Sequence, residues 1–117
     1  MIDFALDEEQ MAIRESARRF TEQEVTPIAQ ARDREPDHHD CFQWDIVEKL
    51  SDIGFRTLTL EERHGGPGAS TLTAAIVCEE LAVGDLGVSA IVAQCAKFAQ
   101  MIQWTVPEAV QEKFLAP

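Results

Sequence analysis

The sequence predicts an all-α fold, a bundle of five to six helices. Apolar residues recur three and four positions apart in successive segments, which is typical of the buried face of a helix. No alternating run ends in a hairpin turn signal, and no internal repeat is present in the sequence. A chain of 117 residues can enclose one hydrophobic core, so residues 1–117 are expected to form a single helical domain.

The first helix is predicted over residues 7–26. Asp7, followed by Gln10 three positions later, is typical of an N-terminal capping box. Pro27 has no backbone N–H and should end or kink the helix, while the residues after it indicate another turn or two. We therefore expect a bent first helix. Its buried face is marked by a stripe at helical spacing: Leu6, Gln10, Ile13, Ala17 and Phe20.

A polar loop with a proline is expected at residues 35–40, with Asp40 as the cap of the next helix. Gly54 is expected to end that helix. Residues 55–60 alternate loosely, which is compatible with a short extended segment, and residues 64–70 are rich in turn-forming glycine and proline. The helix before Gly54 is marked by four apolar residues: Phe42, Ile46, Leu50 and Ile53.

Two further helices are expected at the centre of the bundle. Ser70 or Thr71 can cap the first, which carries two apolar stripes, and residues 84–87 then interrupt the pattern. A last short helix begins near Pro107. The two stripes of the first central helix are Leu72, Ile76 and Val83, and Val77 and Leu81. The second is expected to be mostly buried through Val88, Ile91, Val92, Cys95, Ala96, Ala99 and Ile102, and the last to pack through Val110 and Phe114.

Charge excludes two classes of partner. The formal net charge is −11, from 21 acidic and 10 basic residues, and so acidic a surface repels both nucleic-acid phosphates and anionic lipid headgroups. We expect neither nucleic acid nor a membrane as a partner. Residues 86–106 are weakly charged, but Lys97 and three glutamines within them make a buried helix a better assignment than a membrane span.

A cytoplasmic location is expected from the N-terminus and from the cysteines. The first residues have neither the basic region nor the apolar run of a secretory signal. Cys41, Cys78 and Cys95 are odd in number and lack CxxC spacing, so we expect reduced thiols.

No segment contains a complete catalytic or metal-binding motif. The glycines at residues 65–68 suggest a phosphate site, but a Walker lysine and dinucleotide spacing are missing, so a structural turn is favoured. Residues 38–41 (HHDC) have metal-ligand chemistry but are sequence neighbours, and a solvated loop is favoured. Of Glu79 and Glu80, about 100° apart on a helix, one should face inward, and an ion pair is favoured over catalysis. We predict no catalytic, cofactor-binding or metal-binding residue.

Six segments, in order and at fitting separations, resemble the N-terminal domain of the acyl-CoA dehydrogenase family. FALDEEQ at residues 4–10 is similar to the family's first-helix start, and residues 18–29 are similar to its "F…EV.P.A" signature. The other four are KLSDIGF at 49–55, HGGPGAS at 64–70, VCEELA at 77–82 and EKFL at 112–115. Together they extend over nearly the whole chain.

The resemblance implies an enzyme of three domains, of which this chain would be the first, usually assembled as a homotetramer or dimer of dimers. In that family a glutamate removes the α proton of an acyl-CoA while FAD accepts the β hydride, and an electron-transfer flavoprotein takes the electrons. The base and the FAD-binding segments of most members correspond to positions beyond residue 117. We therefore expect the N-terminal part of a longer flavoprotein oxidoreductase, as in fatty acid metabolism, with no activity and no FAD of its own.

The resemblance also implies that the helix over residues 88–101 forms a wall of the acyl-chain pocket. Small Ala90 and Ala93 would leave space for an acyl group, whereas Lys97 is unexpected in an apolar channel and could instead face solvent. The substrate-binding residues implied are Ser89, Ala90, Ala93, Gln94 and Lys97.

Two alternatives stay open. The same scaffold serves acyl-CoA oxidases and flavin monooxygenases, and the sequence does not separate these from a dehydrogenase. A free-standing, non-enzymatic helical module is the other alternative, because an isolated domain of this kind should expose an apolar surface suited to association.

Overall fold

The computed structural model describes residues 4–115. Within this range the chain forms six α-helices, a π-helical turn at Thr21–Val25, 3-10 turns at Phe55–Thr57 and Glu62–His64, and no strand. The all-α prediction of five to six helices is therefore confirmed. The helices are α1 (Glu8–Phe20), α2 (Thr26–Asp33), α3 (Trp44–Asp52), α4 (Thr71–Gly84), α5 (Leu86–Thr105) and α6 (Glu108–Leu115).

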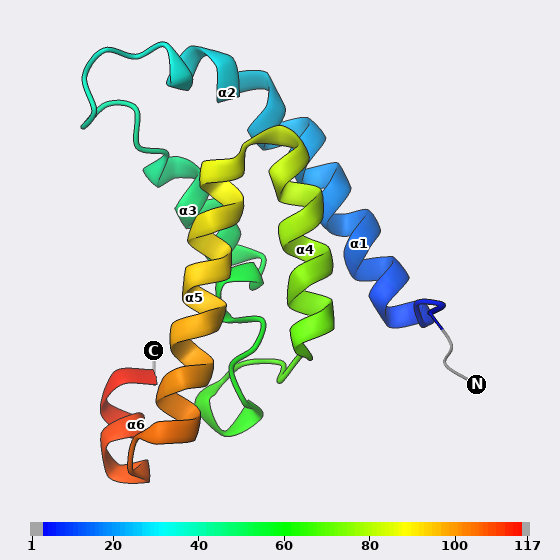
Figure 1. Cartoon of the computed structure of the whole chain (residues 1–117), viewed down its shortest axis with the longest axis vertical. Coiled ribbons are helices and arrows are strands. Elements are labelled where there is room, and N and C mark those ends of the chain that lie inside the picture. The colour runs from blue at the N-terminus through cyan, green and yellow to red at the C-terminus, as the bar shows by residue number, and fades with distance from the viewer. Residues whose placement is uncertain (1–3, 116–117) are drawn as a thin grey trace.

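Helices α4 and α5 form an antiparallel pair at the centre of the molecule (Figure 1). Helix α1 packs on α4, α3 contacts α5, and α6 folds back against the C-terminal end of α5. The molecule measures 42 × 40 × 21 Å, and its shortest dimension is about two helix diameters. Such a thin bundle can bury only the inner faces of its helices.

The core lies where α1, α3, α4 and α5 meet. Its residues come from each of these helices, from the π-helical turn and from the segment after α3. Burial of these apolar side chains is the main stabilising contribution to the fold. The buried cluster consists of Ala17, Val25, Ile46, Leu50, Phe55, Leu58, Ala74, Val77, Leu81, Val88 and Val92.

Helices α1 and α2 are continuous through the π-helical turn and change direction there (Figure 1). Asp7 and Gln10 form the predicted capping box, with the Asp7 carboxylate accepting from the Gln10 N–H at 2.7 Å. In the π turn the Thr26 N–H donates to the Thr21 carbonyl, directly before Pro27. The bent first helix is confirmed, and it continues beyond Pro27 to Asp33, as the residues after the proline predict.

Two local predictions around α3 are wrong. Asp40 does not cap the helix, because α3 begins at Trp44 after an N-cap residue, Gln43, whose side chain makes no capping hydrogen bond. Residues 55–60 are not extended, because the left-handed Gly54, with φ of 80°, leads directly into the 3-10 turn. The predicted helix end at Gly54 is confirmed.

Exposure of apolar side chains also differs from the predictions for the later helices. On α4, Val83 and Leu72 are 80% and 56% exposed, although Val77 and Leu81 are buried as predicted. Helix α5 is apolar around its circumference but buried along one face only, and α6 buries Gln111 instead of Val110 and Phe114. The reason is tertiary: nothing within residues 4–115 covers the outer faces of these helices.

Candidate functional site

An apolar groove of about 370 Å³ lies between α4 and α5. Four of its nine lining residues are alanines, two from each helix, and a methyl side chain leaves space between two packed helices that a larger side chain would fill. It is open at the surface rather than a closed cavity. The lining residues are Thr59, Thr71, Ala74, Ala75, Cys78, Ala93, Ala96, Lys97 and Gln100.

The junction between α4 and α5 holds the groove in shape. The Asp85 carboxylate caps α5 by accepting from the Val88 N–H at 3.1 Å, and it also accepts from the Gln43 amide at 3.0 Å. Next to the junction, the Ser89 hydroxyl donates to the Cys78 carbonyl at 2.7 Å. Of these hydrogen bonds, the one from Ser89 to Cys78 joins α5 directly to α4 near their junction.

The structure places the five predicted site residues in three different environments. Ala93 and Lys97 line the groove. Ser89 is buried, and its hydroxyl is used in the hydrogen bond to α4. Ala90 and Gln94 are exposed on α5 and are not part of the groove wall.

Other groove residues were not predicted from the sequence. Ala96 and Gln100 lie three and seven positions after Ala93, so helical spacing alone could have added them. Cys78 and Thr59 come from segments far away in the sequence, and no sequence signal places them there. The Thr59 hydroxyl donates to the Ala96 carbonyl at 3.2 Å, which fixes it against α5.

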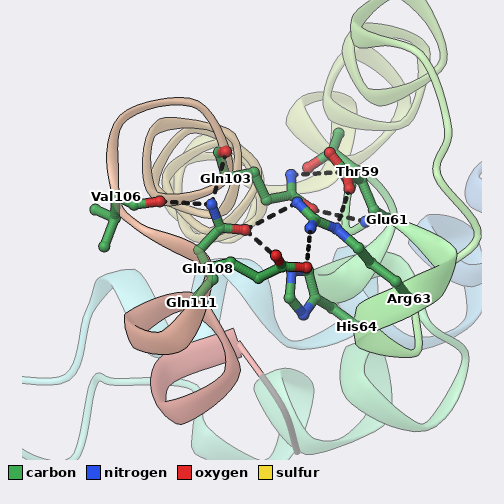
Figure 2. A network of polar contacts seen from close by, with 8 residues as sticks. All are labelled: Thr59, Glu61, Arg63, His64, Gln103, Val106, Glu108 and Gln111. Carbon is green, nitrogen blue, oxygen red and sulfur yellow. Dashed lines mark hydrogen bonds and ion pairs between the residues drawn. The ribbon is translucent and has the colours of Figure 1, made fainter.

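A polar network fastens α6 and residues 59–64 to the end of α5 (Figure 2). The Gln103 side chain accepts from the Glu61 N–H at 2.7 Å and donates to the Thr59 carbonyl at 3.3 Å. The Gln111 amide donates to the carbonyls of Gln103 and Val106 at 3.0 and 2.6 Å. Because Thr59 is in both the network and the groove wall, this network positions one end of the groove.

The Gln111 carbonyl oxygen completes the same network. It accepts from the Arg63 guanidinium at 3.0 Å and lies 3.2 Å from His64 Nε2. Arg63 also pairs with Glu61 and Glu108 at 2.6 and 3.0 Å. Apart from the local Arg63–Glu61 pair, these contacts connect residues 63–64 to α6, so we assign the network a structural role.

Cys78 is the nucleophilic side chain in the groove wall. Burial raises the pKa of its thiol above the ordinary value of 9.0, and a hydrogen bond with Ser89 opposes this effect. A thiol with a raised pKa is a poor nucleophile near neutral pH because its thiolate fraction is small. All three cysteines are free, and none is fully exposed.

Glu80 is the inward-facing member of the predicted glutamate pair, and it forms the expected ion pairs. Its carboxylate lies 2.8 Å from both Arg14 and Arg18 of α1, and Glu79 is exposed. The Arg18 hydrogen bond, against the opposing effect of burial, holds the pKa of Glu80 below its ordinary value of 4.5. A carboxylate whose pKa is lowered by ion pairs is a poorer general base, so we assign Glu80 a structural role.

The glycine-rich loop does not form a phosphate cradle. The N–H groups of Gly65, Gly66 and Gly68 already donate to backbone carbonyls of residues 60–62, at 2.7 to 3.2 Å. A β-carbon on Gly66 would collide with Leu60, so the glycine permits a close approach within the turn. The predicted structural turn is confirmed, and these residues do not fit the phosphates of FAD or coenzyme A.

Two further features bear on the class of site. Among residues 4–115, no three histidine, cysteine or acidic side chains are grouped to hold a metal ion, and residues 38–41 lie in a loop. No helix in the same range is long and apolar enough to cross a bilayer. A larger depression, of about 700 Å³, lies where α1 meets Gly54 and the glycine loop, but no predicted site residue lines it.

Comparison with known proteins identifies the family. Residues 7–117 match the family described as "Acyl-CoA dehydrogenase, N-terminal domain". The chain is 32% identical over 118 residues to a short-chain specific acyl-CoA dehydrogenase of Clostridium acetobutylicum, covering 99% of this chain and 30% of that protein. It is 35% identical over 100 residues to a (2S)-methylsuccinyl-CoA dehydrogenase of Cereibacter sphaeroides, covering 83% of this chain and 17% of that protein.

A third relative has a similar extent of match. Isobutyryl-CoA dehydrogenase of Dictyostelium discoideum is 29% identical over 110 residues, covering 94% of this chain and 26% of that protein. The chain thus spans less than a third of the length of these three relatives. The resemblance predicted from the six sequence segments is confirmed, and the chain belongs to the family of acyl-CoA dehydrogenase N-terminal domains.

Proposed function

We propose that this domain is part of an FAD-dependent enzyme that catalyses α,β-dehydrogenation of acyl-CoA thioesters. Within that enzyme, the groove between α4 and α5 forms one wall of the acyl-chain pocket. The observation that carries the proposal is the groove itself, because it is apolar and is lined by Ala93 and Lys97 on the helix that the resemblance implies. Pockets for acyl groups require such an apolar wall with few polar side chains.

The role of the domain in this proposal is to bind and orient the acyl chain and to exclude water. None of the groove residues is a carboxylate, so the base that removes the α proton comes from elsewhere in the enzyme. The glycine loop offers no free N–H groups to a phosphate, which supports placing FAD and the coenzyme A phosphates on other domains. The 117-residue chain alone is therefore proposed to be inactive, with FAD supplying the redox chemistry in the full-length enzyme.

The partners follow from the same proposal. The substrate is an acyl-CoA, an electron-transfer flavoprotein is the electron acceptor, and the enzyme is a homo-oligomer. The free cysteines support a reducing compartment such as the cytoplasm, because paired cysteines are common in oxidising ones.

Enlarging Ala93 tests whether the groove is the acyl wall. In the full-length enzyme, Ala93→Phe should shorten the longest acyl chain accepted, because the ring would occupy the groove. We expect kcat/KM to fall by at least about tenfold for the longest good substrate and to change little for the shortest, since a few buried methylene groups contribute roughly 1–3 kcal/mol. The measurement is steady-state dehydrogenation over a series of acyl-CoA chain lengths.

Ala109→Phe is the matched control for Ala93→Phe. Ala109 is exposed on α6 and lies outside the groove, so the same substitution there should leave chain-length preference unchanged. An unchanged preference in Ala93→Phe, with normal folding, would show that the groove does not hold the acyl chain.

A free-standing interaction module is a second candidate, favoured by the exposed apolar side chains of α4, α5 and α6. The intact mass of the native protein separates the two candidates. A mass near 13.0 kDa would favour the module, and a mass several times larger would favour the enzyme.

If the protein is an enzyme, oxygen uptake without an added acceptor would indicate an oxidase or monooxygenase instead of a dehydrogenase.

A further inference from the structure

A side-chain hydrogen bond joins the two walls of the α4–α5 groove at one end. The Gln100 amide on α5 donates to the Thr71 hydroxyl on α4 at 3.2 Å, and both residues line the groove. Near the other end, the Ser89 hydroxyl on α5 donates to the Cys78 carbonyl on α4. Because the two helices are antiparallel (Figure 1), these contacts lie toward opposite ends of the groove.

The groove between these contacts has a defined length. Its lining residues on α4 run from Thr71 to Cys78, and those on α5 run from Ala93 to Gln100. Each run advances about 10 Å along its helix axis, at a rise of about 1.5 Å per residue. The two helices therefore offer walls of the same length to a chain that lies along the groove.

The wall is mainly apolar between its two ends. Four alanines line it, with Cys78 at the end near the helix junction. The Lys97 ammonium lies over the Phe98 ring, 4.7 Å from its centre, and Phe98 is not a lining residue. An alkyl chain that lies along the groove therefore packs mostly on methyl groups until it reaches the hydrogen-bonded pair Thr71–Gln100.

We propose that the Thr71–Gln100 hydrogen bond closes one end of the groove and sets the longest acyl chain that the enzyme accepts. This inference rests on the proposed function, in which the groove is a wall of the acyl pocket. Each methylene group that packs on the alanines tightens binding because it leaves water. A chain that continued past the pair would have to break the hydrogen bond and cover its polar groups, which is unfavourable. Thr71 and Gln100 are therefore specificity-determining residues.

Two substitutions of Thr71 separate the hydrogen bond from the size of the side chain. Thr71→Val keeps the branched shape and removes the hydroxyl, so the hydrogen bond is lost and the partly exposed Gln100 side chain can turn to solvent. Thr71→Ser removes the methyl group and keeps the hydroxyl, so the hydrogen bond is retained. Gln100→Ala removes the donor. Thr71→Val and Gln100→Ala should therefore extend the accepted chain, whereas Thr71→Ser should not.

Calorimetric binding of S-alkyl-coenzyme A thioethers of increasing length to the full-length enzyme gives the measurement. These probes lack the carbonyl that acidifies the α proton, so they bind without being dehydrogenated. For the wild type, affinity should rise roughly fourfold with each added methylene group and stop rising when the chain reaches the Thr71–Gln100 pair. A probe two methylene groups longer than this limit should bind Thr71→Val and Gln100→Ala at least about tenfold more tightly than it binds the wild type.

Thr105→Val is the matched control. It removes an exposed threonine hydroxyl of α5 that lies outside the groove and donates to the Met101 carbonyl of the same helix, so the length limit should not change. The double variant of Thr71→Val and Gln100→Ala should bind the longer probe about as tightly as Gln100→Ala alone, because both substitutions remove the same hydrogen bond.

The outcomes separate this inference from the proposed function. If Thr71→Val keeps the wild-type limit, if Thr71→Ser extends it equally, or if the variants change affinity equally at every chain length, the role of the hydrogen bond is refuted and the acyl groove stands. If wild-type affinity does not depend on chain length and Ala93→Phe leaves chain-length preference unchanged, the proposed function fails and the inference fails with it.

Discussion

Glu80 joins α4 to α1 through two arginines that lie more than sixty positions earlier in the sequence. It is only 7% exposed, and its two oxygens accept hydrogen bonds from Arg14 and Arg18 of α1. A buried carboxylate is tolerated only with such partners, because burial alone would strongly disfavour its charge. The sequence indicated that either Glu79 or Glu80 would face inward, and the contact with α1 decided which.

Glu80→Gln should destabilise the domain by about 1–2 kcal/mol at neutral pH, since it weakens hydrogen bonds to two charged groups. Glu79→Gln is the matched control, because it removes the same charge from the exposed neighbouring residue. Urea unfolding followed by circular dichroism measures the difference in the free energy of unfolding. Equal stability of the two variants would contradict the structural role of Glu80.

The effect of Glu80→Gln should also depend on pH. The folded-state pKa of Glu80 is lowered, mainly by the Arg18 hydrogen bond, below the ordinary value of 4.5. Its contribution to stability is therefore complete above the unfolded-state pKa and is lost as pH falls through the folded-state pKa. The stability difference between wild type and Glu80→Gln should be constant near pH 7 and shrink progressively below about pH 4.5.

At the scale of elements, the crossing of α4 over the π-helical turn depends on Gly84. A β-carbon there would lie 2.7 Å from Thr21 Cγ2, 3.0 Å from Thr26 Oγ1 and 3.1 Å from Val25 Cγ1. These distances are shorter than ordinary van der Waals contact. The last turn of α4 can therefore approach the bent first helix only where the side chain is absent.

Gly84→Ala should destabilise the domain by about 1–3 kcal/mol, the usual effect of overpacking a tight contact. Intrinsic helix propensity alone predicts the opposite sign, because alanine is favoured over glycine within helices by up to about 1 kcal/mol. A double-mutant cycle with Thr21→Ser provides the control. Serine lacks the colliding methyl group and keeps the hydroxyl that donates to the Ala17 carbonyl, so Gly84→Ala should be less destabilising in that background.

Thermal unfolding of the four proteins in the cycle gives the measurement. A Gly84→Ala variant more stable than the wild type would show that the crossing can relax without loss. An unchanged effect in the Thr21→Ser background would show that the contact with Thr21 is not the cause.

At the scale of the whole molecule, the outer faces of α4, α5 and α6 are apolar and uncovered by residues 4–115. On α5, the exposed Leu86, Met101 and Trp104 lie within a sector of about 60° on the helix. Exposed apolar surfaces of this kind usually mediate association, either between domains or between chains. In the proposed enzyme, the other domains and the acyl substrate would cover this surface.

The isolated 117-residue chain should therefore self-associate. Trp104 is 73% exposed on α5, and Trp104→Gln should weaken the association more than Trp44→Gln, which removes a similarly exposed tryptophan from α3. Light scattering over a range of concentrations, with binding of a hydrophobic dye, gives the measurement. A chain that stays monomeric at high concentration and binds no dye would contradict the prediction.

Much of the secondary structure could be predicted because its signals are local. Three such features are as predicted: the Asp7–Gln10 capping pair, the Ser70 cap and the left-handed Gly54. Each depends only on residues a few positions away in the sequence. Asp40 was assigned by the same reasoning and is wrong, because the loop before α3 continues to Gln43. Local signals thus determine that a helix forms more reliably than where it begins.

The sequence by itself determined the all-α class, a bundle of five to six helices and the family, because helical periodicity and family motifs are both properties of residues near one another in the chain. Only the tertiary structure decided that Ala93 and Lys97 line a groove, that Ser89 joins α5 to α4, and that the outer faces of α4 and α5 stay exposed. The physical reason is that a helix face is buried or exposed according to which distant helix packs against it. Periodicity identifies such faces, but it does not identify their partners.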